Sequence, residues 1–351
     1  MERNNSLIKL RIIFSVILIS FIISLTIIIF GSFSYTYDFP LPSKLSSDYK
    51  EAYNLGKYLA KNFPNKFSGS EDIKMASDWI KENLNSWNYQ TYVQEFKATL
   101  GKEVNLINIL GIKKGKTDEQ ILILTNFDQA PTSYESASDT SAAVGVVLAL
   151  AHTISNEILN KTVVFAFVDG EEWGMIGASY LMENYPFNKL PLVGIVIEDL
   201  AVGKAVAISA DPIGQFKGYS PLWLRELVKT CSKYIGIDFV QPLGFEEYAQ
   251  RAVLISFTDQ GPLLRYGIPS IQIGTIGDNP ELSREVYHSV KDRYELITLQ
   301  AVETYTKAAE CILRTLDNMY SFPEESSYYL LVNENKVISL PMLLICLLYT
   351  S

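Results

Sequence analysis

Three carboxylates follow a strongly apolar run in the middle of the chain. The run VVFAFV, residues 163–168, leads directly into Asp169, Gly170, Glu171 and Glu172. Carboxylates this close together raise one another's pKa in a low-dielectric crevice unless a cation neutralises them. This arrangement points first to a bound metal ion.

Two other apolar runs also end in acidic residues. ILILTNFD ends at Asp128, and VGIVIEDL ends with Glu198, Asp199 and a leucine. Ligands of open α/β sheets lie beyond the carboxyl ends of the strands, so we expect these side chains to converge on one crevice. A single acidic residue there would be ordinary capping or turn chemistry. Several together favour a ligand site.

One more acid and two histidines complete the candidates. Asp139 lies in a loop of small residues before an apolar helix pattern, where it could cap that helix or bridge two cations. His152 falls inside a helical pattern, which indicates a surface or capping role. His288, in VYHSVKDRYELI, is a candidate ligand because of its acidic neighbours. With two histidines, any metal site must be built largely from carboxylates.

The elements that must position these residues alternate along the chain. Apolar periodicity predicts helices at 48–62, 71–86, 140–155, 219–235 and 297–318. Strand-like runs lie at 104–112, 121–126, 162–168, 192–198 and 269–274. Interleaved strands and helices predict an α/β fold with a largely parallel central sheet.

Composition limits the class of protein. The chain has 351 residues, is 48% hydrophobic and carries a net charge of −9, so it can bury a full core and is a poor partner for nucleic acid. Cys231, Cys311 and Cys346 are too few for a disulfide framework, although one bridge between Cys231 and Cys311 is possible.

The N-terminal region predicts a membrane anchor. Residues 12–30 carry no charge and would be about 28 Å long as a helix, enough to cross a bilayer. Arg3, Lys9 and Arg11 precede this run, which predicts a cytoplasmic N-terminus and a globular domain outside the cytoplasm. A cleaved signal peptide is the alternative, because residues 31–34 are small enough to be cut.

The predicted organisation has four parts. Residues 1–34 form a cytoplasmic stub and transmembrane helix, 35–45 a linker, 46–320 the globular domain, and 321–351 a tail. The apolar end of that tail, 337–351, is too short to span a membrane. A packed tail, an interfacial segment and the start of a second span all stay open for it.

Several segments, in this order, resemble zinc metallopeptidase family 28, which includes secreted bacterial leucine aminopeptidases and glutamate carboxypeptidase. They are NKFSGSEDIKMASDWIKENL, EVNLINILG, VDGEEWGMIGASYLMEN, TDQGPLLRYGIPSIQIG and VYHSVKDRYEL. The resemblance covers most of residues 50–318, with Lys66 in place of the family's arginine. It implies a three-layer α/β/α sandwich around a mostly parallel mixed sheet. Glutaminyl cyclase, nicastrin and the luminal GPI-transamidase subunit share that fold.

The resemblance also implies roles for individual residues. Asp139 would bridge two zinc ions, Glu172 would bind one of them, and Asp199 and His288 would bind the other. Glu171 would be the general base that takes a proton from the attacking water. Tyr287 would hydrogen-bond the developing oxyanion.

The chain departs from the family at the end of the strand at 121–126. Asn126 stands where the family has a zinc-binding histidine, whereas Asp128, which would orient that imidazole, is kept. An amide oxygen is a poor zinc ligand, so the second site should be weak, filled by a harder metal, or empty. We therefore expect one well-held zinc ion, with Asp139, His288 and either Asp199 or Glu172 as ligands.

These features predict a membrane-anchored, outward-facing zinc peptidase that hydrolyses peptides or amino-acid conjugates. The first alternative is a one-zinc acyl transferase resembling glutaminyl cyclase. The second is a non-catalytic, membrane-tethered recognition module resembling nicastrin or the GPI-transamidase subunit, with membrane-protein partners. Metal content separates the second alternative from the enzymes, and product analysis separates the two enzymes.

Overall fold

The computed structural model describes residues 11–22, 32–33, 35–324, 329–334 and 336–339. The chain falls into two compact units. The larger unit contains Asp38–Gln241 and Val253–Glu325. The smaller unit joins Met1–Tyr37, Pro242–Ala252 and Ser326–Ser351.

An eight-stranded mixed sheet forms the centre of the larger unit. The strand order is β2-β3-β5-β4-β6-β9-β7-β8, and the inner strands β5, β4, β6 and β9 are parallel to one another. These four are almost entirely buried, and β4, β5 and β6 are mostly apolar, as expected for parallel strands covered on both faces. The strand bounds are β2 Gln90–Thr99, β3 Glu103–Lys113, β4 Gln120–Asn126, β5 Thr162–Val168, β6 Val193–Ile197, β7 Ala205–Asp211, β8 Asp238–Val240 and β9 Ser270–Gly277.

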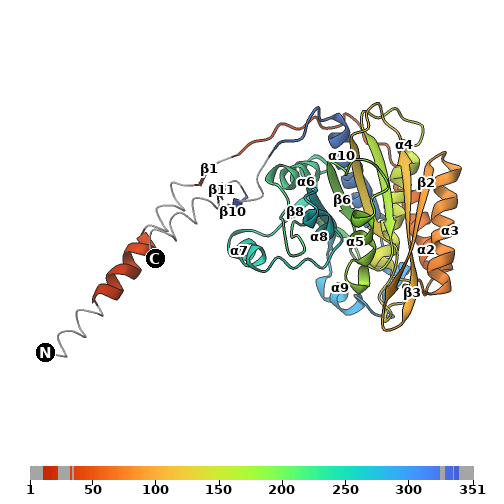
Figure 1. Ribbon diagram of the computed structural model, residues 1–351, viewed down its shortest axis with the longest axis horizontal. Coiled ribbons are helices and arrows are strands. Elements are labelled where there is room, and N and C mark those ends of the chain that lie inside the picture. Colours follow the sequence, from red (N-terminus) through yellow and green to blue (C-terminus); the bar gives the residue numbers. More distant parts are fainter. Residues whose placement is uncertain (1–10, 23–31, 34, 325–328, 335, 340–351) are drawn as a thin grey trace. The chain divides into compact units, whose positions relative to one another are not determined.

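Helices cover both faces of this sheet (Figure 1). One face carries α2 Tyr49–Asn62, α3 Glu71–Ser86, α4 Ala142–Ile154, α6 Leu222–Tyr234 and α10 Leu299–Asn318. The other carries α5 Ile176–Glu183 and α8 Gln260–Arg265, and the short helix α9 Pro280–Val286 follows β9. This architecture confirms the predicted three-layer α/β/α sandwich with a mostly parallel mixed sheet.

Local sequence explains where the helices begin. The side chain of Ser70 accepts a hydrogen bond from the N–H of Ile73 at the start of α3, and Thr298 caps α10 in the same way. A disulfide joins Cys231 of α6 to Cys311 of α10, so the bridge that the sequence allowed is formed. It holds two neighbouring helices on one face of the sheet.

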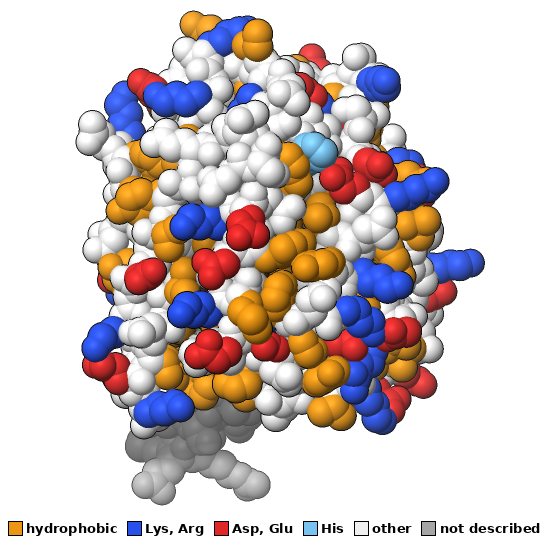
Figure 2. All heavy atoms as spheres, turned by 90° about the vertical axis from the view of Figure 1, so that its right-hand side faces the viewer, with side chains coloured by type: hydrophobic (Ala, Val, Ile, Leu, Met, Phe, Trp, Pro, Cys, Tyr) orange, Lys and Arg blue, Asp and Glu red, His pale blue; other side chains and the backbone are white. Residues whose placement is uncertain are grey.

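Figure 2 shows one face of the described part of the molecule. The face in Figure 2 carries basic and acidic side chains interspersed among apolar ones, rather than a basic patch.

The smaller unit contains a three-stranded antiparallel sheet and a helix. Its strands are β1 Ser32–Phe33, β10 Tyr329–Asn333 and β11 Lys336–Ser339, in the order β1-β11-β10. Most of helix α7, Gly244–Val253, belongs to this unit.

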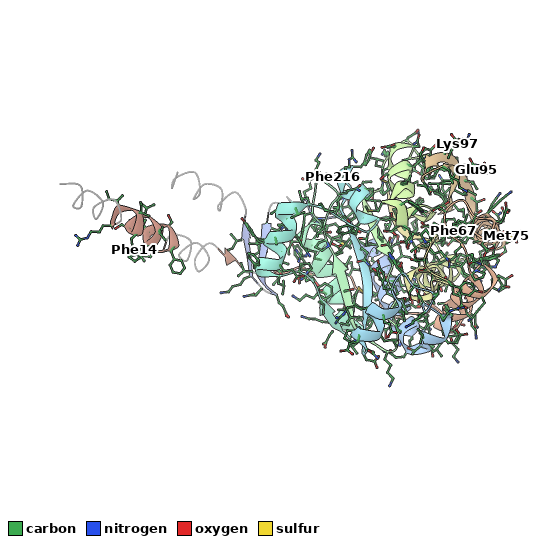
Figure 3. All side chains as sticks on the ribbon, turned by 90° about the horizontal axis from the view of Figure 1, so that it is seen from below. Phe14, Phe67, Met75, Glu95, Lys97 and Phe216 are labelled. Atoms are coloured by element: carbon green, nitrogen blue, oxygen red, sulfur yellow. A yellow bond between two sulfur atoms is a disulfide. The ribbon has the colours of Figure 1, made fainter. Side chains whose placement is uncertain are left out.

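Residues 11–22 of the smaller unit are helical, and apolar side chains such as Phe14 are exposed along them (Figure 3). This helix covers the first part of the predicted membrane span, whose remainder, 23–30, lies outside the described residues. Within the described ranges, the helix long and apolar enough to cross a membrane is 137–154, but 89% of it is buried, so it is a core helix. Residues 340–351 of the tail also lie outside the described ranges.

Candidate active site

The acidic strand ends meet at one edge of the sheet, as the sequence predicts. β5 leads into Asp169 and the two glutamates, β4 leads into Asp128, and β6 leads into Glu198 and Asp199. Because β4, β5 and β6 are parallel, their carboxyl ends lie together. The sheet therefore gathers a large negative charge in one place.

A tight turn presents the two glutamates after β5. Glu171 and Glu172 begin a 3₁₀ turn that is flanked by Gly170 at φ 87° and Gly174 at φ 98°. Both glycines adopt the left-handed region, which other residues enter only with strain. The N–H groups of Glu171 and Glu172 donate to Asp128 at 3.3 and 3.4 Å. Asp128 thus holds this turn in place.

Three side chains converge on one point. Nε2 of His288 lies 3.0 Å from Oδ2 of Asp139 and 3.2 Å from Oε2 of Glu172. One ligand atom from each of the three lies within 4.8 Å of the others. The other oxygen of Glu172, Oε1, is buried and has no hydrogen-bond partner among the described residues. Two carboxylates and an imidazole are a ligand set that suits zinc, with a fourth position left for water or substrate.

The structure groups His288 with Glu172 rather than with Asp199. The resemblance implied the opposite pairing, with Asp199 and His288 on one metal. Asp199 adopts a left-handed backbone conformation, φ 52°, and stays outside the three-residue cluster. Burial and the nearby charge of Asp139 raise the pKa of Asp199 to about 7. Asp199 therefore borders the cluster.

Asp139 does not cap α4. It lies in a π-helical turn, residues 137–141, and has a non-helical backbone at φ −125° and ψ 69°. The N–H groups of Ser138 and Asp139 donate to the buried carboxylate of Asp292 at 2.9 and 3.3 Å. Asp292 thus fixes the loop that turns Asp139 toward His288. Sequence reasoning missed Asp292, whose one signal was its place four residues after His288.

Asn126 is held by protein hydrogen bonds. The hydroxyl of Thr140 donates to Oδ1 of Asn126 at 2.9 Å, and the Asn126 amide donates to Oδ1 of Asp128 at 3.4 Å. Asn126 is buried. The amide links the end of β4 to the Asp128 carboxylate.

Burial makes the ionised form of these acids costly. Burial, followed by the charge of Asp139, raises the pKa of Glu172 to about 10. The pKa of Glu171 is also well above its usual range, because of burial and then the charges of Glu198 and Asp259. A bound cation would favour the ionised forms.

Sequence reasoning did not find Asp259. Its carboxyl group is fully buried and interacts with that of Glu198. Apart from the carboxyl group of Glu198, neither oxygen of Asp259 has a hydrogen-bond partner among the described residues, and burial raises its pKa to about 8. Asp259 lies in TDQGPLLRYGIPSIQIG, a segment that contributes to the family resemblance, but no role was predicted for it.

The segment around Lys66 makes buried hydrogen bonds to residues beside the turn after β5. Ser68 donates to Asp169 at 2.7 Å and to Asp128 at 3.3 Å. Lys66 is fully buried, its ammonium donates to the carbonyl of Glu135 at 2.7 Å, and burial lowers its pKa to about 8.

His152 lies away from these groups, with Nδ1 2.7 Å from Glu51 and its ring stacked on Trp87. Its contacts agree with the surface role that its sequence position indicates.

A cavity of about 350 Å³ adjoins the cluster and is lined in part by Asp199 and Tyr287. The ring of Tyr287 stacks on that of His288, with 3.9 Å between their centroids, and burial raises the pKa of its hydroxyl. The Tyr287 hydroxyl therefore keeps its proton at neutral pH and can donate a hydrogen bond.

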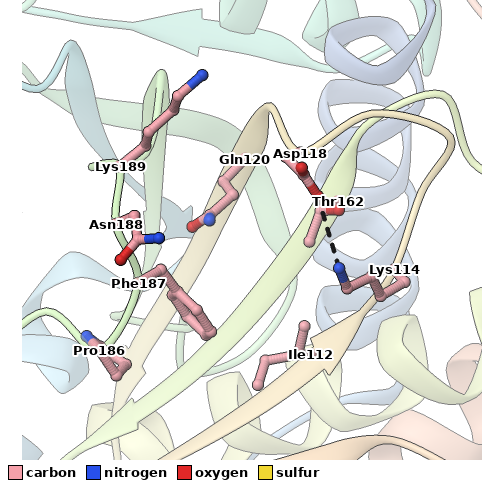
Figure 4. Close-up of a pocket in the computed structure, with 9 residues that line it drawn as sticks. All are labelled: Ile112, Lys114, Asp118, Gln120, Thr162, Pro186, Phe187, Asn188 and Lys189. Atoms are coloured by element: carbon pink, nitrogen blue, oxygen red, sulfur yellow. Dashed lines mark ion pairs between the residues drawn. The ribbon is translucent and has the colours of Figure 1, made fainter.

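A second cavity, of about 360 Å³, lies at the opposite edge of the sheet, where β4 and β5 begin (Figure 4). Its charged groups include the exposed pair of Lys114 and Asp118, 3.5 Å apart. This cavity contains none of the acids at the strand ends, so it is separate from the candidate site.

This chain matches only part of each of two relatives of known sequence. The chain is 24% identical over 172 residues to the alkaline phosphatase isozyme conversion protein of Escherichia coli, covering 42% of this chain and 50% of that protein. It is 32% identical over 115 residues to the vacuolar membrane protease of Saccharomyces cerevisiae, covering 32% of this chain and 12% of the protease. The chain thus spans half or less of the length of these relatives.

Solved structures share the fold over nearly their whole length. The glutaminyl cyclase of Porphyromonas gingivalis matches with a TM-score of 0.65 and 18% identity, covering 76% of this chain and 97% of the cyclase. A zinc aminopeptidase of Bacillus subtilis matches with a TM-score of 0.66 and 14% identity, covering 80% of this chain and 98% of the aminopeptidase. At these identities the likeness shows the fold alone.

The family model for Peptidase family M28 matches residues 108–312. The match spans the turn after β5, the loop that carries Asp139, and His288. The chain belongs to peptidase family M28.

Proposed function

We propose that this chain is a zinc-dependent peptidase that hydrolyses peptide bonds with a single tightly held zinc ion. The observation that carries the proposal is the convergence of Asp139, Glu172 and His288 within 4.8 Å. The unpaired oxygen of Glu172 and its raised pKa fit this interpretation, because both are the mark of a carboxylate that lacks its cation.

The residues of the site divide the work of hydrolysis. A zinc ion held by Asp139, Glu172 and His288 would polarise the scissile carbonyl and lower the pKa of a water molecule. Glu171 accepts the proton of the attacking water and returns it to the leaving amine. The hydroxyl of Tyr287 donates a hydrogen bond to the oxyanion as it develops.

The base and the ligand differ in what surrounds them. Glu172 faces Asp139 and His288, whereas Glu171 is influenced first, after burial, by the carboxyl groups of Glu198 and Asp259. Because the neighbouring carboxyl groups hold protons, Glu171 is well placed to accept a proton and to release it again. This difference supports Glu171 as base and Glu172 as ligand.

The cavity beside Asp199 and Tyr287 is where we place the substrate. It opens next to the cluster, and its lining mixes the carboxylate of Asp199 with apolar residues such as Leu200 and Val202. A volume of about 350 Å³ suits one amino-acid side chain rather than a folded protein. We therefore propose short peptides or amino-acid conjugates as substrates.

A membrane location is part of the proposal. The uncharged run at 12–30 begins as an exposed helix, and the yeast relative is described as a vacuolar membrane protease. The disulfide between Cys231 and Cys311 suits an oxidising compartment, which supports a catalytic domain outside the cytoplasm.

Metal content and turnover test the proposal together. Elemental analysis of the full chain in mild detergent should give about one zinc per chain, and the loss of that zinc in Asp139→Ala should abolish peptidase activity. Glu171→Gln should keep the zinc and lose turnover by roughly 10²- to 10⁴-fold. The exposed Glu281 of α9 offers the matched control Glu281→Gln, which should retain both. A chain that takes up no zinc at micromolar concentration would overturn the proposal.

Cyclisation of N-terminal glutamine is a second candidate. Two observations favour it: the single cluster of three ligands, and the similarity in fold to the Porphyromonas gingivalis glutaminyl cyclase. Product analysis separates the two reactions. A peptide with N-terminal glutamine would release ammonia and keep its length under a cyclase, whereas a peptidase would shorten it.

A further inference from the structure

Helix α7, Gly244–Val253, has its apolar and polar sides reversed with respect to solvent. Phe245, Tyr248 and Ala252 follow one another at helical spacing and lie on one side of the helix. Phe245 is 83% exposed and Tyr248 is 54% exposed, with their ring centroids 6.3 Å apart. Ala252 is also exposed. The apolar side of α7 thus faces outward.

The charged side of the same helix faces inward. Glu247 is completely buried and pairs with Arg251, whose Nη2 lies 2.8 Å from the Glu247 carboxylate. The guanidinium of Arg251 in turn lies 4.3 Å from the centre of the Tyr329 ring in β10. Burying an ion pair while exposing two aromatic rings is unfavourable in water. This arrangement is favourable if an apolar phase covers the outer side of α7.

The rest of this unit indicates which apolar phase that is. β1 pairs with β11 through Ser32 and Ile338, and β11 pairs with β10 through Ile338 and Leu330. The uncharged run at 12–30 ends two residues before β1. Two strand spacings and one helix-on-sheet distance place α7 within about 20 Å of β1.

We propose that α7 is an interfacial helix whose outer side, formed by Phe245, Tyr248 and Ala252, lies on the lipid bilayer that residues 12–30 cross. Aromatic rings, and tyrosine in particular, are favoured at the boundary between hydrocarbon and water. Attachment at two places would fix the orientation of the smaller unit on the membrane. The proposal does not depend on peptidase activity.

Site-specific spin labels on the full chain in vesicles test this proposal. Cys346→Ser leaves the disulfide-bonded Cys231 and Cys311 as the remaining cysteines, so that one added cysteine carries the label. The vesicles contain phosphatidylcholine with phosphatidylglycerol. Labels at Phe245→Cys and Tyr248→Cys should be more accessible to oxygen, which concentrates in the bilayer, than to a water-soluble nickel chelate.

Two control positions make the result decisive. Glu246 is exposed on the same helix but points away from the apolar side, so a label at Glu246→Cys should favour the nickel chelate. A label at Ile17→Cys, in the exposed N-terminal helix, should lie deep in the bilayer. Labels at positions 245 and 246 that behave alike would overturn the proposal, as would a water-exposed label at position 17. Spectral broadening at position 245 that disappears on dilution with unlabelled protein would identify a second copy as the occupant and would also overturn it.

Discussion

The buried carboxyl group of Asp259 should make the metal-free protein less stable as the pH rises. Its pKa of about 8 in the folded chain exceeds the value of ~3.9 expected for an unfolded aspartate. The folded state therefore binds more protons than the unfolded state between these two values. The resulting stabilisation is complete below about pH 4 and is lost progressively as the pH rises to about 8.

The size of the effect follows from the difference in pKa. The folded state holds nearly one extra proton from pH 5 to about pH 7 and about half a proton at pH 8, and one proton over one pH unit corresponds to ~1.4 kcal/mol. The free energy of unfolding should fall by about 3 kcal/mol over this interval because of the proton that Asp259 and its partner Glu198 hold in the fold. Asp259→Asn cannot ionise, so its free energy of unfolding should fall by correspondingly less.

Urea unfolding followed by tryptophan fluorescence measures this difference. The full chain would be stripped with a chelator in mild detergent and unfolded at pH 5 and pH 8. Between pH 5 and pH 8, Asp259→Asn should lose less stability than the wild type, whereas Asp118→Asn, at an exposed aspartate, should lose as much as the wild type. Equal losses in the wild type and Asp259→Asn would refute the argument that this buried acid holds its proton in the fold.

Three further predictions concern other parts of the larger unit. Asn126→His restores an imidazole at the end of β4, so elemental analysis should show the zinc content rising from about one to about two per chain; an unchanged content would mean that the position cannot supply a ligand. Tyr287→Phe removes a donor to the oxyanion and should lower kcat by roughly 10²-fold with little change in KM, measured by steady-state kinetics; a change in KM alone would assign Tyr287 to binding. Replacing Cys231 and Cys311 with alanine removes a bridge between residues 80 apart, which should cost about 4 kcal/mol in urea unfolding, and a cost below about 1 kcal/mol would contradict that expectation.

The inner part of the sheet was readable from sequence because its strands are continuous apolar runs. The runs predicted at 162–168 and 121–126 are β5, Thr162–Val168, and β4, Gln120–Asn126. Strand β2, Gln90–Thr99, was missed, since it lies at the edge of the sheet and alternates exposed polar residues with half-buried ones. A strand of that kind has no apolar run to mark it.

Part of the candidate site could also be predicted from the sequence, for a related reason. Glu171 and Glu172 are marked by the apolar strand that precedes them, and parallel pairing brings neighbouring strand ends together. No such pattern identifies Asp259 or Asp292. Asp259 contacts Glu198 and Asp292 contacts the loop that carries Asp139, and both partners are distant in sequence. Pattern alone also could not choose the partner of His288, which depends on backbone geometry at Asp199.

The partners of the individual acids argue for one cation rather than two. The charges of Asp139 and Glu172 equal that of one divalent ion, and His288 completes their group. Asp128 instead receives two backbone N–H groups and the Asn126 amide. The Asn126 amide donates a hydrogen bond to Asp128 without a metal ion. A histidine at this position would direct one ring nitrogen toward Asp128 and leave the other to bind a metal. Asn126 thus links Asp128 to a hydrogen-bond network of the chain itself, and this supports the proposal of a single zinc ion held by Asp139, Glu172 and His288.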